Sequence, residues 1–229
     1  GAHLYYRADA ETRRFAEQRL QQLLGPLNVT VGSARYTPGG VTLRDLSVYR
    51  RLPNGDVGCA LKLGECRLAG RLDVASLVRG HSSIGRVTLT DAQLLLKRDR
   101  SGRWGFEGLR LPAGGGRPTP KIEIHNATLL IDDPAIRSEP LAVTGINAEG
   151  EPMTDSPGWY EFRAESSGKL ARRLAVAGQV RAADGAARMR VLTQDLQIDD
   201  TLVASLATLG VRPPAVRLAG SISVDGRVT

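Results

Sequence analysis

A strand-like motif recurs three times in this sequence, and it constrains the fold more than any other feature. The copies are VTLRDLSVY (Val41–Tyr49), VTLTDAQLLL (Val87–Leu96) and IEIHNATLLI (Ile122–Ile131). In each copy, apolar residues occupy every second position up to an Asp or Asn, which is the period of a strand with one buried face. The three segments therefore predict three similar β-strands.

The alternation changes phase at one point in each copy. At Asp45, Asp91 and Asn126 the pattern slips by one residue, and the apolar positions then continue in the new phase. Such a slip would turn all later side chains to the other face unless an extra residue is absorbed as a bulge. Because the three strands would bulge at the same point, we expect one sheet that bends repeatedly in the same direction.

A second repeat supports a sheet built from similar strands. The segment LAVAGQV (174–180) has the pattern LxVxGxV, and VRLAGSISV (216–224) has the related pattern VxLxGxIxV. Glycine occupies the same slot in both, and glycine inside a strand favours a tight bend or a close backbone approach.

Helices are expected in three places. Residues 9–24 carry an apolar stripe at helical spacing and end at Gly25-Pro26, whereas Val74–Arg79 and Thr201–Leu209 are short. The Gly- and Pro-rich segment after Leu111 is the best internal boundary. The resulting division is 1–26 for the N-terminal helix, 27–112 for a first β block, 113–120 for the loop and 121–229 for a second β block that is truncated at its C-terminus.

About ten strands with one apolar face need a covering layer, and three helices cannot shield so large a sheet. A second sheet, closure into a barrel, or a bound ligand could cover that face. Aromatic residues make up only 4% of the chain, which disfavours a barrel with a thick core. The fold class we predict is mainly β: a strongly curved, open antiparallel sheet that forms a groove, with an N-terminal helix and one or two short helices.

Charge and cysteine content exclude some function classes. The net charge is +7, but the basic residues are scattered over polar strand positions without interleaved aromatic residues, so a nucleic-acid interface is not expected. Cys59 and Cys66 would lie ~23 Å apart in one extended strand, too far for a disulfide. We therefore expect two free thiols.

The chain offers no catalytic signature. Its histidines are His3, His81 and His125, and it has no HExxH, CxxC, GxSxG or phosphate-binding glycine loop. The carboxylate pairs Asp132-Asp133 and Asp199-Asp200 each precede a turn or a helix start, and an N-cap role explains Asp199 or Asp200. The expectation is a protein that is not an enzyme and has no cofactor or metal.

Both ends of the sequence favour a piece of a longer protein. No stretch of 18 apolar residues is present, so nothing here is predicted to span a bilayer. Residues 4–7, Leu-Tyr-Tyr-Arg, are typical of the interfacial end of a transmembrane helix, and the opposite end stops in a strand pattern. We expect a membrane anchor that precedes this sequence.

The region 41–109 resembles the AsmA-like family, whose relatives include TamB and the bridge-like lipid-transfer proteins with repeating β-grooves. The resemblance rests on VTLRDLSVY, RLDVASLVRG and IGRVTLTDAQLLLKRDRSGRWGFEGL. In the family a strand leads into a short "sLlrG" helix, followed by "i..v.l..a.l.l.r...G.wnf..l". Gly105 departs from that pattern, because the family usually has Asn at this position. A weaker similarity covers the residues from 201 onward.

The resemblance implies a groove for phospholipid acyl chains in the periplasm of a diderm bacterium, between the inner and outer membranes. It further implies an inner-membrane anchor, a role in outer-membrane biogenesis and membrane-protein partners. It transfers no catalytic, cofactor or metal residues. A structural or scaffolding β-domain with a dry core, which binds protein partners through strand edges, is the alternative.

Smooth aliphatic positions with few polar anchors favour a conduit over a high-affinity pocket. Exposing a 16-carbon chain to water costs about 12 kcal/mol, which a continuous aliphatic lining would offset at every step. The predicted lipid-binding residues on the concave face are Val41, Leu43, Leu46, Val48, Val87, Leu89, Leu94, Leu96, Ile122, Ile124, Leu129, Ile131, Val176, Val180, Val216, Leu218, Ile222 and Val224.

Overall fold

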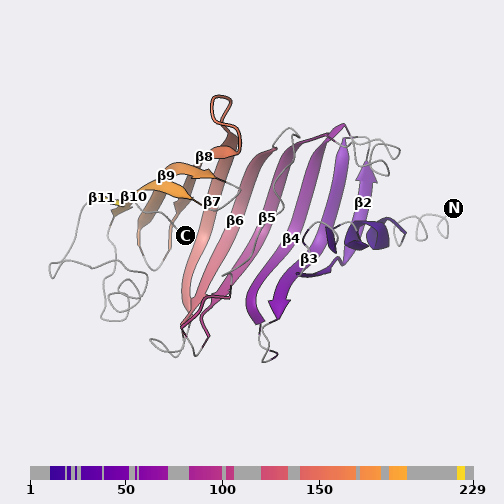
Figure 1. Cartoon of the computed structure of the whole chain (residues 1–229), viewed down its shortest axis with the longest axis horizontal. Coiled ribbons are helices and arrows are strands. Elements are labelled where there is room, and N and C mark those ends of the chain that lie inside the picture. Colours follow the sequence, from indigo (N-terminus) through magenta and orange to yellow (C-terminus); the bar gives the residue numbers. More distant parts are fainter. Residues whose placement is uncertain are drawn as a thin grey trace.

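The computed structural model of the chain is dominated by one large sheet (Figure 1). It describes residues 11–18, 20–21, 24, 27–37, 39–51, 55, 57–71, 83–99, 102–105, 120–133, 140–168, 171–181, 186–194 and 221–224. The predicted short helices at 74–79 and 201–209 lie outside these residues, as does nearly all of the predicted loop at 113–120.

Eleven strands make up the sheet in the described part of the chain. Residues 11–18, 20, 21 and 24 are helical, which confirms the N-terminal helix. The strands are β1 (Asn28–Thr30), β2 (Ser33–Thr37), β3 (Gly40–Arg51), β4 (Val57–Arg71), β5 (Ser83–Lys97), β6 (Lys121–Asp132), β7 (Leu141–Pro152), β8 (Trp159–Ser166), β9 (Arg173–Arg181), β10 (Ala187–Gln194) and β11 (Ser221–Val224).

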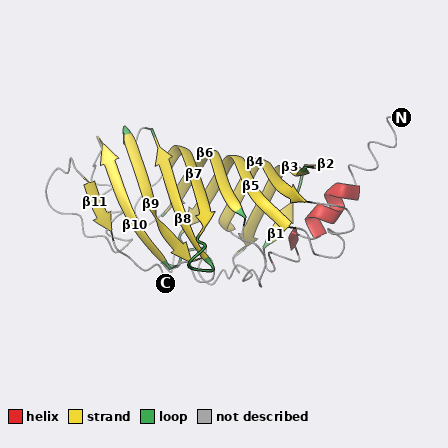
Figure 2. Ribbon diagram, turned by 90° about the horizontal axis from the view of Figure 1, so that it is seen from above, coloured by secondary structure: helices red, strands yellow, loops and turns green. Residues whose placement is uncertain are grey.

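The strand order follows the sequence from β3 to β11, and β1 and β2 both pair with β3. The two views in Figures 1 and 2 place β2 and β11 at opposite ends, so the sheet is open and not a barrel. This confirms the predicted fold class: a mainly β chain with an open sheet and an N-terminal helix.

One pair of strands departs from the predicted antiparallel arrangement. β5 and β6 are parallel, whereas the other neighbouring pairs are antiparallel. Parallel neighbours need a connection of about a dozen residues or more to return the chain to the same end of the sheet. The stretch 98–120 supplies that length. Because β5 and β6 are directly paired, the blocks before and after the 113–120 segment belong to one continuous sheet.

The three residues at the predicted phase changes have an unusual backbone. Asp45, Asp91 and Asn126 have φ values of 52°, 53° and 55°, and among the described residues other than glycine they alone have positive φ. Asp and Asn tolerate this left-handed conformation better than most residues. The sequence pattern therefore located the irregularity in each strand correctly.

The form of the irregularity differs from the predicted bulge at Asp45 and Asp91. Arg44 pairs with Glu65 and Leu46 pairs with Leu63, so neither strand gains a residue as the ladder passes Asp45. The same constant register holds between β4 and β5 on both sides of Asp91. The bulge is unnecessary because the neighbouring strands turn at the same level and pairing is kept.

A two-against-one irregularity of the predicted kind does occur between β6 and β7. His125 and Asn126 of β6 lie between the pairs Ile124↔Ala148 and Ala127↔Ile146, which are separated by only one residue of β7. The backbone N–H of Asn126 donates to Oδ1 of that residue, Asn147, at 3.1 Å.

The three residues with positive φ lie in one row across the strands together with two glycines, and we call this row the crease: Gly32, Asp45, Gly64, Asp91 and Asn126. The N–H of Gly32 donates to the carbonyl oxygens of Arg44 and Asp45 at 3.0 and 3.2 Å. A Cβ at Gly32 would lie 2.7 Å from Cβ of Asp45, so only glycine fits there. Nδ2 of Asn126 donates to Oδ1 of Asp91 at 2.6 Å. The crease crosses the strands and bends each one at the same level.

Candidate functional site

The strand register places the predicted lining residues of β3, β5 and β6 on one face of the sheet. Directly paired residues point to the same side, so each cross-strand row identifies a common face. Three such rows run without a break from β3 to β6: two on one side of the crease and one on its other side. These rows are Val41–Leu68–Val87–Ile122, Leu43–Cys66–Leu89–Ile124 and Val48–Leu61–Leu94–Leu129. We call the side that they share the apolar face.

The sequence reasoning missed the contribution of β4 to the apolar face. Leu61, Leu63, Cys66 and Leu68 join the predicted residues of β3 to those of β5. Their spacing contains the same phase change as the three recognised copies, but Glu65 stands at the position of the Asp or Asn. A search that allowed Glu at that position and Cys at the next would have found the fourth copy.

The apolar face continues beyond β6. The row from Ile124 passes through Ala148, Ala164 and Val176 to Val191. A parallel row runs from Tyr160 through Val180 to Ala187. The predicted residues Val176 and Val180 therefore share a face with those of β3–β6. The other residues in these rows were not predicted, because β7 and β8 have too few large aliphatic residues to stand out.

Four predicted lining residues belong to the last strand pattern. Ile222 and Val224 pair with Val191 and Met189 in the ladder between β10 and β11. Val216 and Leu218 lie outside the described residues.

Burial on the apolar face is concentrated beside the crease in β1–β5. Leu43 is 2% exposed, and Leu46, Leu63, Cys66 and Ala92 are also buried in the same cluster. The remaining predicted residues whose side chains are described are half-buried, with the exception of Val41, which is buried. No predicted lining residue of β6 or β9 is buried. The described chain therefore buries one end of its apolar face more deeply than the other.

The opposite face carries the charges. Nε of Arg44 lies 3.1 Å from Oε2 of its cross-strand partner Glu65. Lys121 contacts Glu123, Glu149 and Glu151, and its hydrogen bond to Glu151 raises the pKa of Lys121 and lowers that of the carboxyl. His125 is exposed on this face. The ion pairs of Arg44 and Lys121 thus lie on the side of the strands that is opposite the apolar face.

An ion pair near the end of β5 explains one of the predicted carboxylate pairs. Nη1 of Arg98 lies 3.1 Å from Oδ2 of Asp133, and Lys97 faces Asp132 at 3.8 Å. The Arg98 guanidinium also lies over the Trp104 ring, with its Cζ 5.7 Å from the ring centroid. A Cβ at Gly105 would collide with the backbone of Gly58, which accounts for glycine at this position. These groups hold the end of the strand in place.

The two cysteines are free thiols on the apolar face, as predicted. Burial raises the pKa of Cys66 to about 11, with a smaller effect from the neighbouring Glu65. Burial also raises the pKa of Cys59, while Arg50 opposes the shift. Neither thiol is activated as a nucleophile, because activation requires a lowered pKa.

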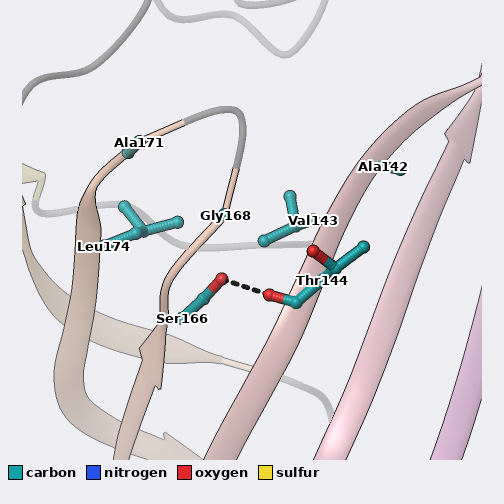
Figure 3. Close-up of a pocket in the computed structure, with 7 residues that line it drawn as sticks. All are labelled: Ala142, Val143, Thr144, Ser166, Gly168, Ala171 and Leu174. Carbon is teal, nitrogen blue, oxygen red and sulfur yellow. Dashed lines mark hydrogen bonds between the residues drawn. The ribbon is translucent and has the colours of Figure 1, made fainter.

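A small hollow lies between β7 and the connection from β8 to β9 (Figure 3). Oγ of Ser166 donates to the carbonyl oxygen of Thr144 at 2.7 Å in its wall. Its volume of about 10 Å³ is at the limit for one water molecule. The lining residues are Ala142, Val143, Thr144, Ser166, Gly168, Ala171 and Leu174. This hollow is too small for a substrate or an acyl chain.

Within the residues that the structure covers, no three His, Cys, Asp or Glu side chains are grouped to hold a metal ion. Over the same residues, no helix combines the length and the apolar character needed to cross a bilayer. No protein-family model, curated protein or solved structure matches the chain. The apolar face is therefore the feature on which a function has to be argued.

Proposed function

We propose that the apolar face is a groove that carries the acyl chains of phospholipids. The observation that supports this most is the shared face of Leu61, Leu94, Leu129 and Val176, which lie on strands from β4 to β9. These side chains are half-buried, and in the described part of the chain no second sheet covers them. Extended uncovered apolar surface usually marks a binding site.

The chemistry of the lining fits a conduit for a flexible aliphatic ligand. The rows consist mainly of Leu, Ile, Val and Ala, and the ion pairs of Arg44 and Lys121 lie on the other side of the sheet. An acyl chain gains about 0.8 kcal/mol for each CH₂ group it buries, without a polar group that holds it at one position. The ligand can therefore move along the face with little change in free energy.

The resemblance to the AsmA-like family adds the setting. Under this proposal the chain works in the periplasm, is anchored to the inner membrane and carries phospholipid toward or from the outer membrane. It performs no catalysis and uses no cofactor or metal. A scaffolding domain with a dry core is the competing function, and the buried cluster around Leu43 is the observation in its favour.

Adjacent leucines on β6 provide a matched test. Leu129 lies on the apolar face, whereas Leu130 pairs with Leu95 and Ala142 on the opposite face, and both leucines are half-buried. A photoreactive amino acid placed at Leu129 should crosslink to phospholipid when the chain is expressed in cells. The yield of the lipid crosslink should be at least tenfold lower when the same amino acid is placed at Leu130.

Native mass spectrometry of the purified chain provides the second readout. Co-purifying phospholipid that is lost in Leu129→Asp and kept in Leu130→Asp supports the groove, provided that circular dichroism shows both variants folded. Equal crosslinking at the two positions, or a lipid-free mass together with no crosslink at either, would favour the scaffold and reject the groove.

A further inference from the structure

The N-terminal helix is attached to the first strand of the sheet through two side chains. Oε1 of Glu17 accepts a hydrogen bond from the N–H of Val31 at 2.8 Å, and Oε1 of Gln21 accepts one from the N–H of Val29 at 3.2 Å. Nε2 of Gln21 donates to the carbonyl oxygen of Leu27. Two consecutive turns of the helix therefore bind alternate backbone groups of β1 and its flanks.

These hydrogen bonds use the edge of β1 that faces away from β3. Along an antiparallel edge strand, alternate N–H groups point outward and can pair with another strand. Val29 and Val31 are two residues apart, and both N–H groups are used by helix side chains. The helix thus closes this edge of the sheet to further pairing at β1.

The same helix also rests on the apolar face. Ala16 and Leu20 pack against the buried cluster that includes Val31, Ala34 and Leu43. Figures 1 and 2 both place the helix at the β1–β3 end of the sheet. Phe15 of the same helix is 37% exposed. The side chains of Ala16 and Leu20 therefore occupy apolar surface that is left uncovered on β6.

We infer that the helix is a stopper that ends the acyl-chain path at β3, with Glu17 and Gln21 as the residues that position it. This inference rests on the proposed function, because it assigns the boundary of the same groove. Acyl chains then lie along β4–β10, and they reach the apolar face of β3 only when the helix is displaced. The ligand and the helix compete for one surface.

Photocrosslinking at two positions of one row tests the boundary. Val48 of β3 and Leu129 of β6 share the row that passes through Leu61 and Leu94. In the native sequence, a photoreactive group at Leu129 should crosslink to phospholipid and one at Val48 should crosslink about tenfold less. In a chain that carries both Glu17→Ala and Gln21→Ala, the yield of the Val48 crosslink should rise about tenfold. The yield of the Leu129 crosslink should stay within twofold of its value in the native sequence.

Two further variants separate the attachment from a general loss of structure. Glu17→Gln keeps an Oε1 acceptor for the N–H of Val31, so it should retain the native crosslinking pattern. Leu20→Ser removes packing against the buried cluster but leaves the hydrogen bonds of Glu17 and Gln21, so it should also release the helix and raise the Val48 crosslink. Far-ultraviolet circular dichroism must show the sheet intact in each variant.

Amide hydrogen exchange tests the stopper without any lipid. Loss of the acceptors in E17A/Q21A should speed exchange at Val29 and Val31 at least tenfold, with no change at Leu94. A Val48 crosslink equal to that at Leu129 in the native sequence, or one unchanged after release, overturns the stopper and leaves the groove standing. Absence of every crosslink rejects the groove, and faster exchange in that case shows that the helix caps the edge of a lipid-free sheet.

Discussion

Leu43 and Ile124 occupy the same cross-strand row, on the same side of the crease, yet their surroundings differ. Leu43 is 2% exposed within the cluster beside the N-terminal helix, whereas Ile124 on β6 is half-buried. The two residues belong to copies of one sequence motif. The difference teaches that equivalent strands serve as core at one end of the sheet and as uncovered surface at the other.

The largest expected effect comes from truncating this pair. Leu43→Ala should reduce the free energy of unfolding by about 3–5 kcal/mol, because it leaves a cavity in a closed cluster. Ile124→Ala should cost about 1–2 kcal/mol, since a half-buried side chain loses less buried area. Urea denaturation of both variants measures the difference. Equal losses would mean that β6 belongs to a conventional core.

The two thiols of β4 sharpen the comparison through pH. The pKa of the Cys66 thiol is about 11 in the folded chain, against 9.0 for an unperturbed thiol. Its contribution to stability is complete below pH 9 and is lost as the pH rises toward 11, because the unfolded chain releases the proton first. Between about pH 8 and about pH 10.5 the free energy of unfolding should fall by about 2 kcal/mol more in the native sequence than in Cys66→Val.

The matched variant at the other thiol is Cys59→Val. Cys59 is half-buried and its raised pKa is opposed by Arg50, so removing it should change the pH dependence less than removing Cys66. Urea denaturation at the two pH values provides both slopes. Identical slopes in the two variants would contradict the difference in burial along β4.

The crease should behave alike in both regions, because its strain is local. Asp45→Val and Asn126→Val place a β-branched residue at φ values of 52° and 55°, and each should cost about 1–2 kcal/mol. Asp45→Gly and Asn126→Gly are the controls and should be nearly neutral, since glycine adopts this conformation freely. Thermal unfolding measures all four. A loss of stability in Asp45→Val alone would show that the left-handed conformation matters only at the buried end of the sheet.

The smallest effects are expected for ion pairs on the charged face. Arg44–Glu65 on β3 and β4 and Arg173–Glu165 on β9 and β8 are both largely exposed, with closest N–O distances of 3.1 and 2.7 Å. Double-mutant cycles to alanine should give coupling energies below about 1 kcal/mol for each pair, weaker at high salt. A much larger coupling at either site would show that the charged face is covered there in solution.

Much of the fold was readable because strand periodicity is a local property. Alternation at Val41 and Leu43, followed by the slip at Asp45, predicted both the strand and the place where its backbone becomes left-handed. The same reading of β5 and β6 placed Leu94 and Leu129 on a common face, which the register bears out. The equivalent strand β4 escaped notice because Glu65 and Cys66 replace the Asp or Asn and the Leu or Ala of the other copies.

The order of apolar and polar residues by itself determined which side of each strand is apolar and where each strand bends, because both depend on neighbours within a few residues. Only the tertiary structure decided that β5 and β6 run parallel, that β3 and β5 pass the crease without gaining a residue, and that the helix packs against the cluster around Leu43 while Ile124 stays half-buried. Burial depends on what lies above a side chain, and that neighbour comes from a distant part of the chain.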